Sequence, residues 1–511
     1  MRDVMQNLSS RGPGAWRWCM VGVVLLGVLM IAARTQGPSD LDSKDQPKTV
    51  SYTVDMAENG RYLLPKDVRG QWATKPPFYN WVSLPVVGGL GIHEDWSFKL
   101  PSIVTFLGLL GLTAGAVVCV LSPTWWGRDR VGAAAVIACL IWVSLPPVMS
   151  LAYVARPDML LAFFLVVGWL AVTRCLQDPA RPWFWPVVVW VSVALAWLTK
   201  GPPALLVPVY AVVAAPFVGG RWGSVWRTGI VWGLPLSVVP FVGWVWGSYV
   251  IAPDYMSQTM LGNELSRVQG QGGVLAYPLG LILTSWELPF FFLFRALPWS
   301  WLFVALWLSR NKIVRHRMSC LTPAWVWCLV VVGFMSLVVS KRDDYLLPMY
   351  PAMAALMGVG LVSHPWARGW AGLKRVLWAA VAATVVVMGI VVGNEVLLNP
   401  ERQVGWAENA RSFARAIEGE VGDERVLFER SGYHPLQTYM GLNQSTESPV
   451  DGAWDDAAWV VAPLVLVGDR EPVLVSKELP NVLRERQAVG LFRRESGLAW
   501  PPVWAEVTAE E

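Results

Sequence analysis

The sequence predicts a polytopic α-helical membrane protein with a small soluble α/β domain at its C-terminal end. Only 15% of the 511 residues are charged and 54% are hydrophobic, whereas soluble domains usually carry about 25% charged residues. The 32 tryptophans fit this class, because tryptophan is enriched where a bilayer meets water. The net charge of +4 is too small to imply a nucleic-acid partner.

Apolar runs close to the roughly 20 residues that cross a bilayer recur through most of the chain. We expect about eleven transmembrane helices, at residues 15–33, 102–121, 131–149, 158–174, 184–199, 202–219, 229–250, 289–309, 322–339, 346–363 and 376–394. The first run can also be interpreted as a cleaved signal peptide. We favour an uncleaved anchor, because the run is long and Arg34 makes the preceding Ala32–Ala33 a poor cleavage site.

The positive charges select one orientation for these spans. Short cytoplasmic loops of membrane proteins carry an excess of lysine and arginine. Here the basic residues gather in alternate connections, and the N-terminal Arg2 and Arg11 belong to the same set. We therefore expect a multi-pass protein of the cell (inner) membrane with a cytoplasmic N-terminus. The first polar loop and the C-terminal region then lie on the outer side.

One long outer loop, residues 34–101, organises the membrane domain, which we place at residues 1–398. Its part from Asp45 to Pro77 is rich in charged residues, whereas 76–101 is apolar but interrupted by Pro85 and by glycines. The second part predicts short helices in the membrane interface. A charged loop tethered this close to a bilayer can carry out water-dependent chemistry on a lipid-borne substrate, so we take it as the catalytic loop.

Five short polar motifs occur in order on the outer side of this topology. They are Asp45–Gln46–x–Lys48 with Met56-x-x-x-Gly60, Lys75–Pro76–Pro77 and Tyr79–Asn80–Trp81 further along the same loop; Ala155–Arg156–Pro157–Asp158; Thr199–Lys200–Gly201–Pro202; Glu264-x-x-Arg267; and Lys341 with Tyr345–Leu346–Leu347–Pro348. In this order they resemble the GT-C glycosyltransferases that use polyprenyl-phosphate sugars, the group of the aminoarabinose transferases and protein mannosyltransferases. The resemblance covers about residues 15–365 and implies a GT-C-like fold.

The resemblance also implies catalytic acids. Asp45 matches the family's first acid and Asp158 a second outer acid. A carboxylate can deprotonate or orient the acceptor if it lies within hydrogen-bond reach. Each residue has a structural alternative. Asp45 could cap a helix that begins near Gln46–Pro47, and Asp158 could be a helix N-terminal acid favoured by the dipole.

A leaving polyprenyl phosphate gains negative charge, which fixed cations stabilise. Lys75 is our main phosphate ligand, with an interfacial lysine that reaches toward water as the alternative. The further residues carried over from the motifs are Lys48, Arg267, Lys341 and Arg342 for the phosphate, and Tyr79, Glu264 and Tyr345 for donor or acceptor sugar contacts.

No cofactor is firmly implied by the sequence, although a divalent metal ion is compatible with the resemblance. The family commonly has acids where this chain has Gln46 and Thr74, which weakens the expectation of metal binding. The cysteines all lie in or beside apolar spans, and His93 and His434 are far apart in the sequence, so we assign no metal ligands.

Residues 399–511 predict a separate soluble α/β domain. An amphipathic helix is expected at 401–419, strands at 425–429 and 458–467, and a strand or loop followed by a helix at 473–486. The region contains no glycine-rich phosphate loop and no nucleophile elbow. Acceptor recognition and packing over the catalytic loop both remain open as roles for it.

The resemblance therefore implies an inverting hexosyl- or pentosyltransferase in the membrane. It would move a sugar from a polyprenyl-phosphate donor to a lipid, glycan or protein acceptor at the outer face. A transporter or flippase of lipid-linked substrates is the alternative from another class, but such proteins carry ionisable groups or broken helices at mid-membrane. A non-catalytic membrane scaffold is a third interpretation, which Gln46 makes plausible.

Overall fold

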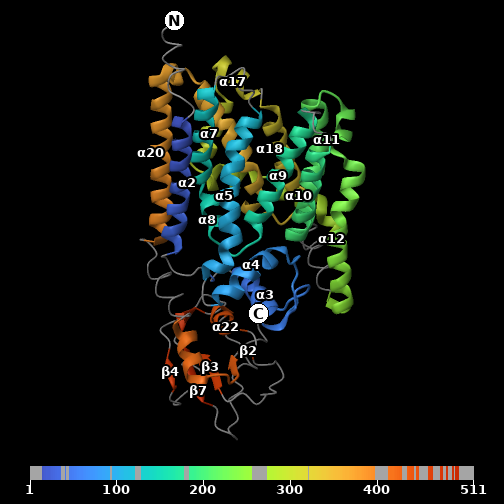
Figure 1. Ribbon diagram of the computed structural model, residues 1–511, viewed down its shortest axis with the longest axis vertical. Helices are drawn as coiled ribbons and strands as arrows, with labels where there is room; N and C mark the ends of the chain where they lie inside the picture. The colour runs from blue at the N-terminus through green and yellow to red at the C-terminus, as the bar shows by residue number, and fades with distance from the viewer. Residues whose placement is uncertain are drawn as a thin grey trace.

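The computed structural model describes most of the membrane region and part of the C-terminal region (Figure 1). The described residues are 14–35, 41, 45–68, 70–92, 95–120, 128–177, 183–255, 273–319, 321–396, 412–428, 434–441, 445–447, 459–463, 472–475, 479–480, 486–487 and 489–493. Long helices form one bundle, α3 and α4 lie beneath it in the view of Figure 1, and the C-terminal strands lie below them.

The bundle is built from apolar helices. They are α2 (Gly14–Thr35), α5 (Asp95–Val120), α7 (Arg128–Val143), α8 (Pro146–Ala152), α9 (Asp158–Gln177), α10 (Phe184–Lys200), α11 (Leu206–Val218), α12 (Ile230–Ile251), α14 (Gly273–Leu283), α15 (Glu287–Phe290), α16 (Trp299–Trp307), α18 (Thr322–Met335), α19 (Tyr350–Ser363) and α20 (Gly369–Val396). The short basic helix α17 (Lys312–Ser319) packs against α19.

Within the described residues, seven helices are long and apolar enough to cross a membrane, and the bent pair α7 and α8 would make an eighth. Three shorter apolar helices lie at Phe184–Lys200, Pro202–Val218 and Thr322–Met335. The predicted class of polytopic helical membrane protein is thus confirmed, while the count of about eleven spans stays a prediction.

Two predicted spans have different bounds in the structure. Helix α5 begins at Asp95 instead of residue 102, so the part of the outer loop expected to form short interfacial helices contains one, α4 (Phe78–Leu90). The span expected at 289–309 is broken near Pro298, and an apolar helical stretch at Tyr277–Arg295 meets the requirement for a span instead. A proline lacks a backbone N–H and can interrupt a helix. The residues on both sides of Pro298 are apolar, so the hydropathy of the sequence does not show the break.

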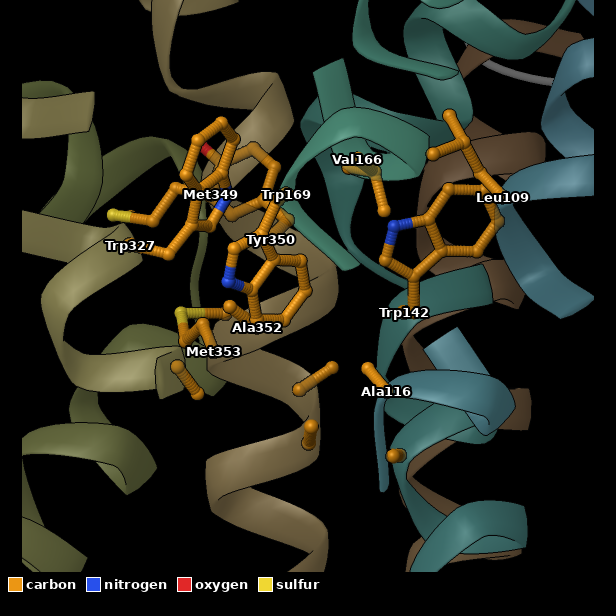
Figure 2. Close-up of a cluster of buried hydrophobic side chains, with 14 of the residues drawn as sticks. Leu109, Ala116, Trp142, Val166, Trp169, Trp327, Met349, Tyr350, Ala352 and Met353 are labelled. Atoms are coloured by element: carbon orange, nitrogen blue, oxygen red, sulfur yellow. The ribbon is translucent and has the colours of Figure 1, made fainter. Parts of the chain in front are cut away.

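Aromatic packing fixes the helices that lead to the outer loops (Figure 2). Trp169 of α9 and Trp327 of α18 stack with ring centroids 5.7 Å apart. The Trp327 indole N–H donates to the carbonyl oxygen of Pro348 at 2.8 Å, which satisfies its one polar atom in the buried core. Pro348 lies in the 3-10 helix η5 (Asp343–Met349). The core therefore holds η5 at a fixed position beside α9.

The outer loop begins with α3 (Asp45–Asn59) and returns to the bundle in α4. The buried Asp55 carboxylate accepts hydrogen bonds from Asn59, Arg61 and the backbone N–H of Lys66, at 2.8, 2.7 and 2.7 Å. The Asn80 side chain of α4 donates to the Thr49 carbonyl oxygen of α3 at 2.7 Å. The loop is thus held by polar contacts within the loop itself.

The C-terminal region contains a mixed sheet and two helices. Strands β1 (Val426–Phe428), β2 (Ser445–Glu447), β3 (Trp459–Pro463), β4 (Leu474–Val475) and β7 (Val489–Arg493) have the order β2-β1-β3-β7-β4. Strand β1 pairs in parallel with β2 and β3, and β7 pairs antiparallel with β3 and β4. The two helices span residues 412–421 and α22 (His434–Met440), and β5 (Leu479–Pro480) pairs with β6 (Arg486–Gln487).

Expected and described elements in this region can be compared only in part. The strands expected at 425–429 and 458–467 correspond to β1 and β3, and the helix at residues 412–421 overlaps the expected 401–419 helix and ends two residues beyond it. The helix expected before residue 486 lies largely outside the described residues; β5 and β6 occupy the described part.

The C-terminal region packs directly on α3. Val50 and Val54 of α3 share one buried apolar cluster with Leu436, Tyr439 and Met440 of α22. After α22 the chain turns at Gly441, where an added Cβ atom would lie 2.2 Å from a carboxylate oxygen of Glu58. Gly441 also has a φ of 81°, which residues with a Cβ atom rarely adopt. The shared apolar cluster joins the first outer loop and the C-terminal region in one packed unit.

Candidate active site

The site is built around an irregular segment, residues 153–157, between α8 and α9. Ala155 is fully buried, and the Ser102 hydroxyl of α5 donates to the Val154 carbonyl oxygen at 2.7 Å. From α3, the Gln46 side-chain oxygen accepts the Ala155 backbone N–H at 3.0 Å. These contacts place Arg156 and Asp158 at the end of the bundle that faces the outer loop.

Four charged side chains meet at this point. The Asp158 carboxylate contacts Lys200 at the end of α10 and lies 2.9 Å from a guanidinium nitrogen of Arg156. The same Arg156 nitrogen lies 2.5 Å from Asp344 in η5. The side chains of Asp158 and Asp344 are only 4% and 3% exposed, so these pairs are shielded from the screening that weakens surface ion pairs. Arg156 therefore bridges two buried carboxylates.

Further cations surround this ionic cluster, which we define as Arg156, Asp158, Lys200 and Asp344. Arg342 Nε lies 3.4 Å from Asp344, and the charge of Lys75 acts on Asp158. Counting these two, four cationic side chains face two carboxylates. The ionic cluster itself is neutral, and Arg342 and Lys75 add two positive charges beside it, which suits an anionic ligand.

Two of the expected sugar contacts lie near the cluster. The Lys200 ammonium lies 5.7 Å from the ring centroid of Tyr345, within the range of a cation–π interaction. Tyr79 is buried, and its hydroxyl donates to the Phe98 carbonyl oxygen at 2.9 Å. Burial raises the pKa of Tyr79 well above its ordinary value, so the phenol stays neutral and its hydroxyl serves the packing of α4 on α5.

Two of the expected phosphate ligands make other contacts. Lys48 of α3 lies 3.9 Å from the buried carboxylate of Asp67, across the outer loop. Lys341 donates to the Thr284 hydroxyl at 2.5 Å, and burial lowers the pKa of its ammonium group. Neither of these contacts involves a member of the ionic cluster, whereas Lys75 and Arg342 both act on it.

Three of the expected site residues cannot be placed through their side chains. Asp45 is the first residue of α3, whereas the capping interpretation expects the helix to begin after it, near Gln46–Pro47. The side chain of Asp45 lies outside the described residues. Glu264 and Arg267 also lie outside the described part of the chain.

Sequence reasoning missed three members of the cluster. Arg156, Lys200 and Asp344 lie inside or beside the recognised motifs, but the motifs alone do not mark them as site residues. The available signal was an ionisable residue at the end of an apolar span, which is costly to bury without a partner. The pairing itself joins residues 188 and 42 positions apart, which no local pattern reveals.

No metal centre is found among the residues that the structure describes. No group of three or more His, Cys, Asp or Glu side chains gathers there. The two buried carboxylates instead face guanidinium and ammonium groups.

Comparison with known proteins identifies the class of fold. No family model matches the chain. The ArnT structure from Cupriavidus metallidurans bound to undecaprenyl phosphate aligns over 96% of this chain and 100% of its own, with a TM-score of 0.67 at 18% identity. The Archaeoglobus fulgidus oligosaccharyltransferase aligns over 87% and 69%, with a TM-score of 0.53 at 11% identity. The chain has the GT-C fold that its motifs predicted.

Sequence relatives narrow the resemblance further. The undecaprenyl phosphate-alpha-4-amino-4-deoxy-L-arabinose arabinosyl transferase of Shewanella sediminis is 23% identical over 353 residues, covering 67% of this chain and 59% of the relative. Transferase 1 of that name from Pseudomonas fluorescens is 24% identical over 357 residues, covering 68% and 58%. The chain thus spans about three fifths of the length of these curated relatives, and its resemblance to the aminoarabinose transferase group is confirmed.

Proposed function

We propose that this protein is an integral-membrane glycosyltransferase that takes a sugar from a polyprenyl-phosphate donor at the outer face of the inner membrane. The observation that carries the proposal is the buried ionic cluster with the additional cations Arg342 and Lys75 beside it, at the end of the bundle that meets the first outer loop. The names of the sequence relatives support undecaprenyl phosphate as the lipid carrier.

The cluster can assist departure of the donor phosphate. As the glycosidic bond breaks, negative charge grows on the phosphate oxygens, and preorganised cations stabilise that charge more than they stabilise the ground state. Lys75 and Arg342 are the cations that we assign to the phosphate. Asp344 and Asp158 hold the neighbouring Arg156 and Lys200 in place by direct contact, so these charges need not reorganise during the reaction.

The two catalytic acids take different roles in this proposal. Asp158 contacts two cations, an environment that favours its ionised form, so it orients the cationic side of the site. Asp45, at the start of α3, is the proposed general base that activates the acceptor. Attack from the face opposite the departing phosphate would invert the configuration at the anomeric carbon.

The remaining features of the proposal concern organisation and partners. Residues 1–398 form the transmembrane transferase domain with its catalytic loop at 34–101, and residues 399–511 form an α/β domain on the outer side. Packing of α22 on α3 supports a role for this domain in holding the loop. The acceptor is a lipid, glycan or protein reached from the outer face.

A transporter of lipid-linked substrates fits the geometry less well. In the described helices the charged cluster lies at the ends of α9 and α10 and beside η5, whereas transporters place their ionisable groups near mid-membrane. A scaffold without activity does not require cations that buried carboxylates hold in fixed positions.

The test is turnover by the purified protein. Wild-type protein in lipid vesicles is incubated with labelled undecaprenyl-phosphate sugars and an outer-membrane lipid fraction, and both release of free undecaprenyl phosphate and passage of the intact donor across the membrane are measured. We expect release that depends on both protein and acceptor. Passage of an intact donor across a vesicle membrane without release would favour the transporter, and neither event would favour the scaffold.

A further inference from the structure

Gln46, the second residue of α3, is hydrogen-bonded to the backbone of the active-site segment. Its side chain is 1% exposed, and its Oε1 atom accepts the backbone N–H of Ala155 at 3.0 Å. The two residues are 109 positions apart in the sequence. A side chain of the first outer loop therefore holds the backbone directly before Arg156.

The segment around Ala155 depends on such contacts, because it is neither helix nor strand. Its carbonyl groups are held from one side: Ser102 donates to Val154 at 2.7 Å and lies 3.3 Å from the Arg156 carbonyl oxygen. The Ala155 N–H is held from α3 by Gln46. A buried backbone N–H that loses its partner is strongly disfavoured, so without Gln46 the segment would shift.

The helix that carries Gln46 is itself well anchored. Asn80 of α4 bonds to α3 at Thr49 and Thr53, at 2.7 and 2.8 Å. On another face, Val50 and Val54 pack into the cluster shared with α22. Gln46 thus extends from a fixed helix to an irregular segment whose other contacts include Ser102 and Tyr79 at the Val154 carbonyl oxygen.

We propose that Gln46 is a positioning residue, whose amide oxygen fixes Ala155 so that Arg156 bridges Asp158 and Asp344 in the geometry needed for sugar transfer. This inference rests on the proposed function and deepens it. A displacement of about 1 Å in a catalytic group can cost about a hundredfold in rate, so one acceptor atom at this point suffices to control the rate.

Three variants separate this role from a generally structural one. Gln46→Met keeps the length of the side chain but removes the acceptor, whereas Gln46→Glu keeps an acceptor oxygen. Gln71→Met is the control, because Gln71 lies in the same loop with an exposed side chain. Donor kinetics, thermal stability and hydrogen exchange of peptides that contain Ala155 are measured for each.

We expect Gln46→Met to lower kcat about 10- to 100-fold with a much smaller change in the donor KM. Exchange at the Ala155 amide should become faster by about tenfold. Gln46→Glu should restore both properties to near the wild-type values, and Gln71→Met should change neither.

Two results would overturn the inference. One is wild-type exchange at Ala155 in Gln46→Met; the other is a Gln46→Glu variant as impaired as Gln46→Met. The exchange measurement needs no turnover, so a protein that transfers no sugar would refute the proposed function, while the exchange data would still decide whether Gln46 holds the segment.

Discussion

Asp344 and Asp343 offer a matched test of the ionic cluster, because the same substitution can be made at neighbouring positions with opposite environments. The Asp344 side chain is 3% exposed and contacts Arg156 at 2.5 Å. The Asp343 side chain is 41% exposed and lies 3.6 Å from Arg295, which is itself 65% exposed. Replacement by asparagine removes the charge at each site and nearly preserves the size.

The structure predicts different losses of stability for Asp344→Asn and Asp343→Asn. A hydrogen bond to a charged group contributes about 1.5–3 kcal/mol. Arg156 keeps Asp158 at 2.9 Å, so we expect Asp344→Asn to cost about 2 kcal/mol. An exposed ion pair contributes about 0–1 kcal/mol, so Asp343→Asn should leave stability almost unchanged. Because Arg156 would lose one of its two anchors, transfer by Asp344→Asn should fall at least about tenfold.

The assay combines thermal unfolding in detergent, followed by tryptophan fluorescence, with the initial rate of release of undecaprenyl phosphate. We expect a lower unfolding temperature and a lower rate for Asp344→Asn only. Equal effects of the two substitutions on both properties would refute the reasoning, because burial and the Arg156 bridge would then make no difference.

Two further predictions concern the catalytic base and the orientation. Asp45→Asn should lower the transfer rate by about 10²–10⁴-fold with little loss of stability, since asparagine also caps helices well; a variant that keeps more than about a tenth of the rate excludes Asp45 as the base. Cysteines introduced at Lys66 and Asp423, in a background without native cysteines, should react with an impermeant external reagent, and one at Lys312 should not; labelling of Lys312 from outside would reverse the topology.

The fold could be predicted from the sequence because its signals are local. Hydropathy over about 20 residues located most helices, and short motifs in order indicated the GT-C fold. The error near Pro298 shows where this fails: the sequence stays apolar across the break before Trp299, whereas α12 continues through Pro235 and Pro240, so hydropathy cannot tell the two cases apart. Its consequence was a misplaced span at 289–309 in place of Tyr277–Arg295.

The sequence motifs predicted single residues of the site but not the contacts between them. Lys75 and Asp158 followed from motifs, and the structure places both at one ionic cluster. The role of Arg156 as a bridge depends on Asp344, far along the chain. For Lys48, a position on the motif says nothing of the nearby Asp67 carboxylate, so its phosphate role stays a prediction. Asp55 likewise serves the loop through three hydrogen bonds, a role that its sequence context does not reveal.

The central claim is that this cationic site binds the phosphate of a polyprenyl carrier, and a binding measurement tests it most directly. Lys75 and Lys66 are half-buried lysines of the same outer loop, but only Lys75 acts on the ionic cluster, whereas Lys66 lies over the ring of Trp72 at 4.3 Å. Native mass spectrometry or titration with undecaprenyl phosphate and undecaprenol compares wild type, Lys75→Ala and Lys66→Ala.

We expect wild type and Lys66→Ala to bind undecaprenyl phosphate much more tightly than undecaprenol. Lys75→Ala should weaken binding of the phosphate about 10- to 100-fold and leave undecaprenol unchanged. Equal affinity of the wild-type protein for the phosphate and the alcohol, or equal loss in the two lysine variants, would contradict the account.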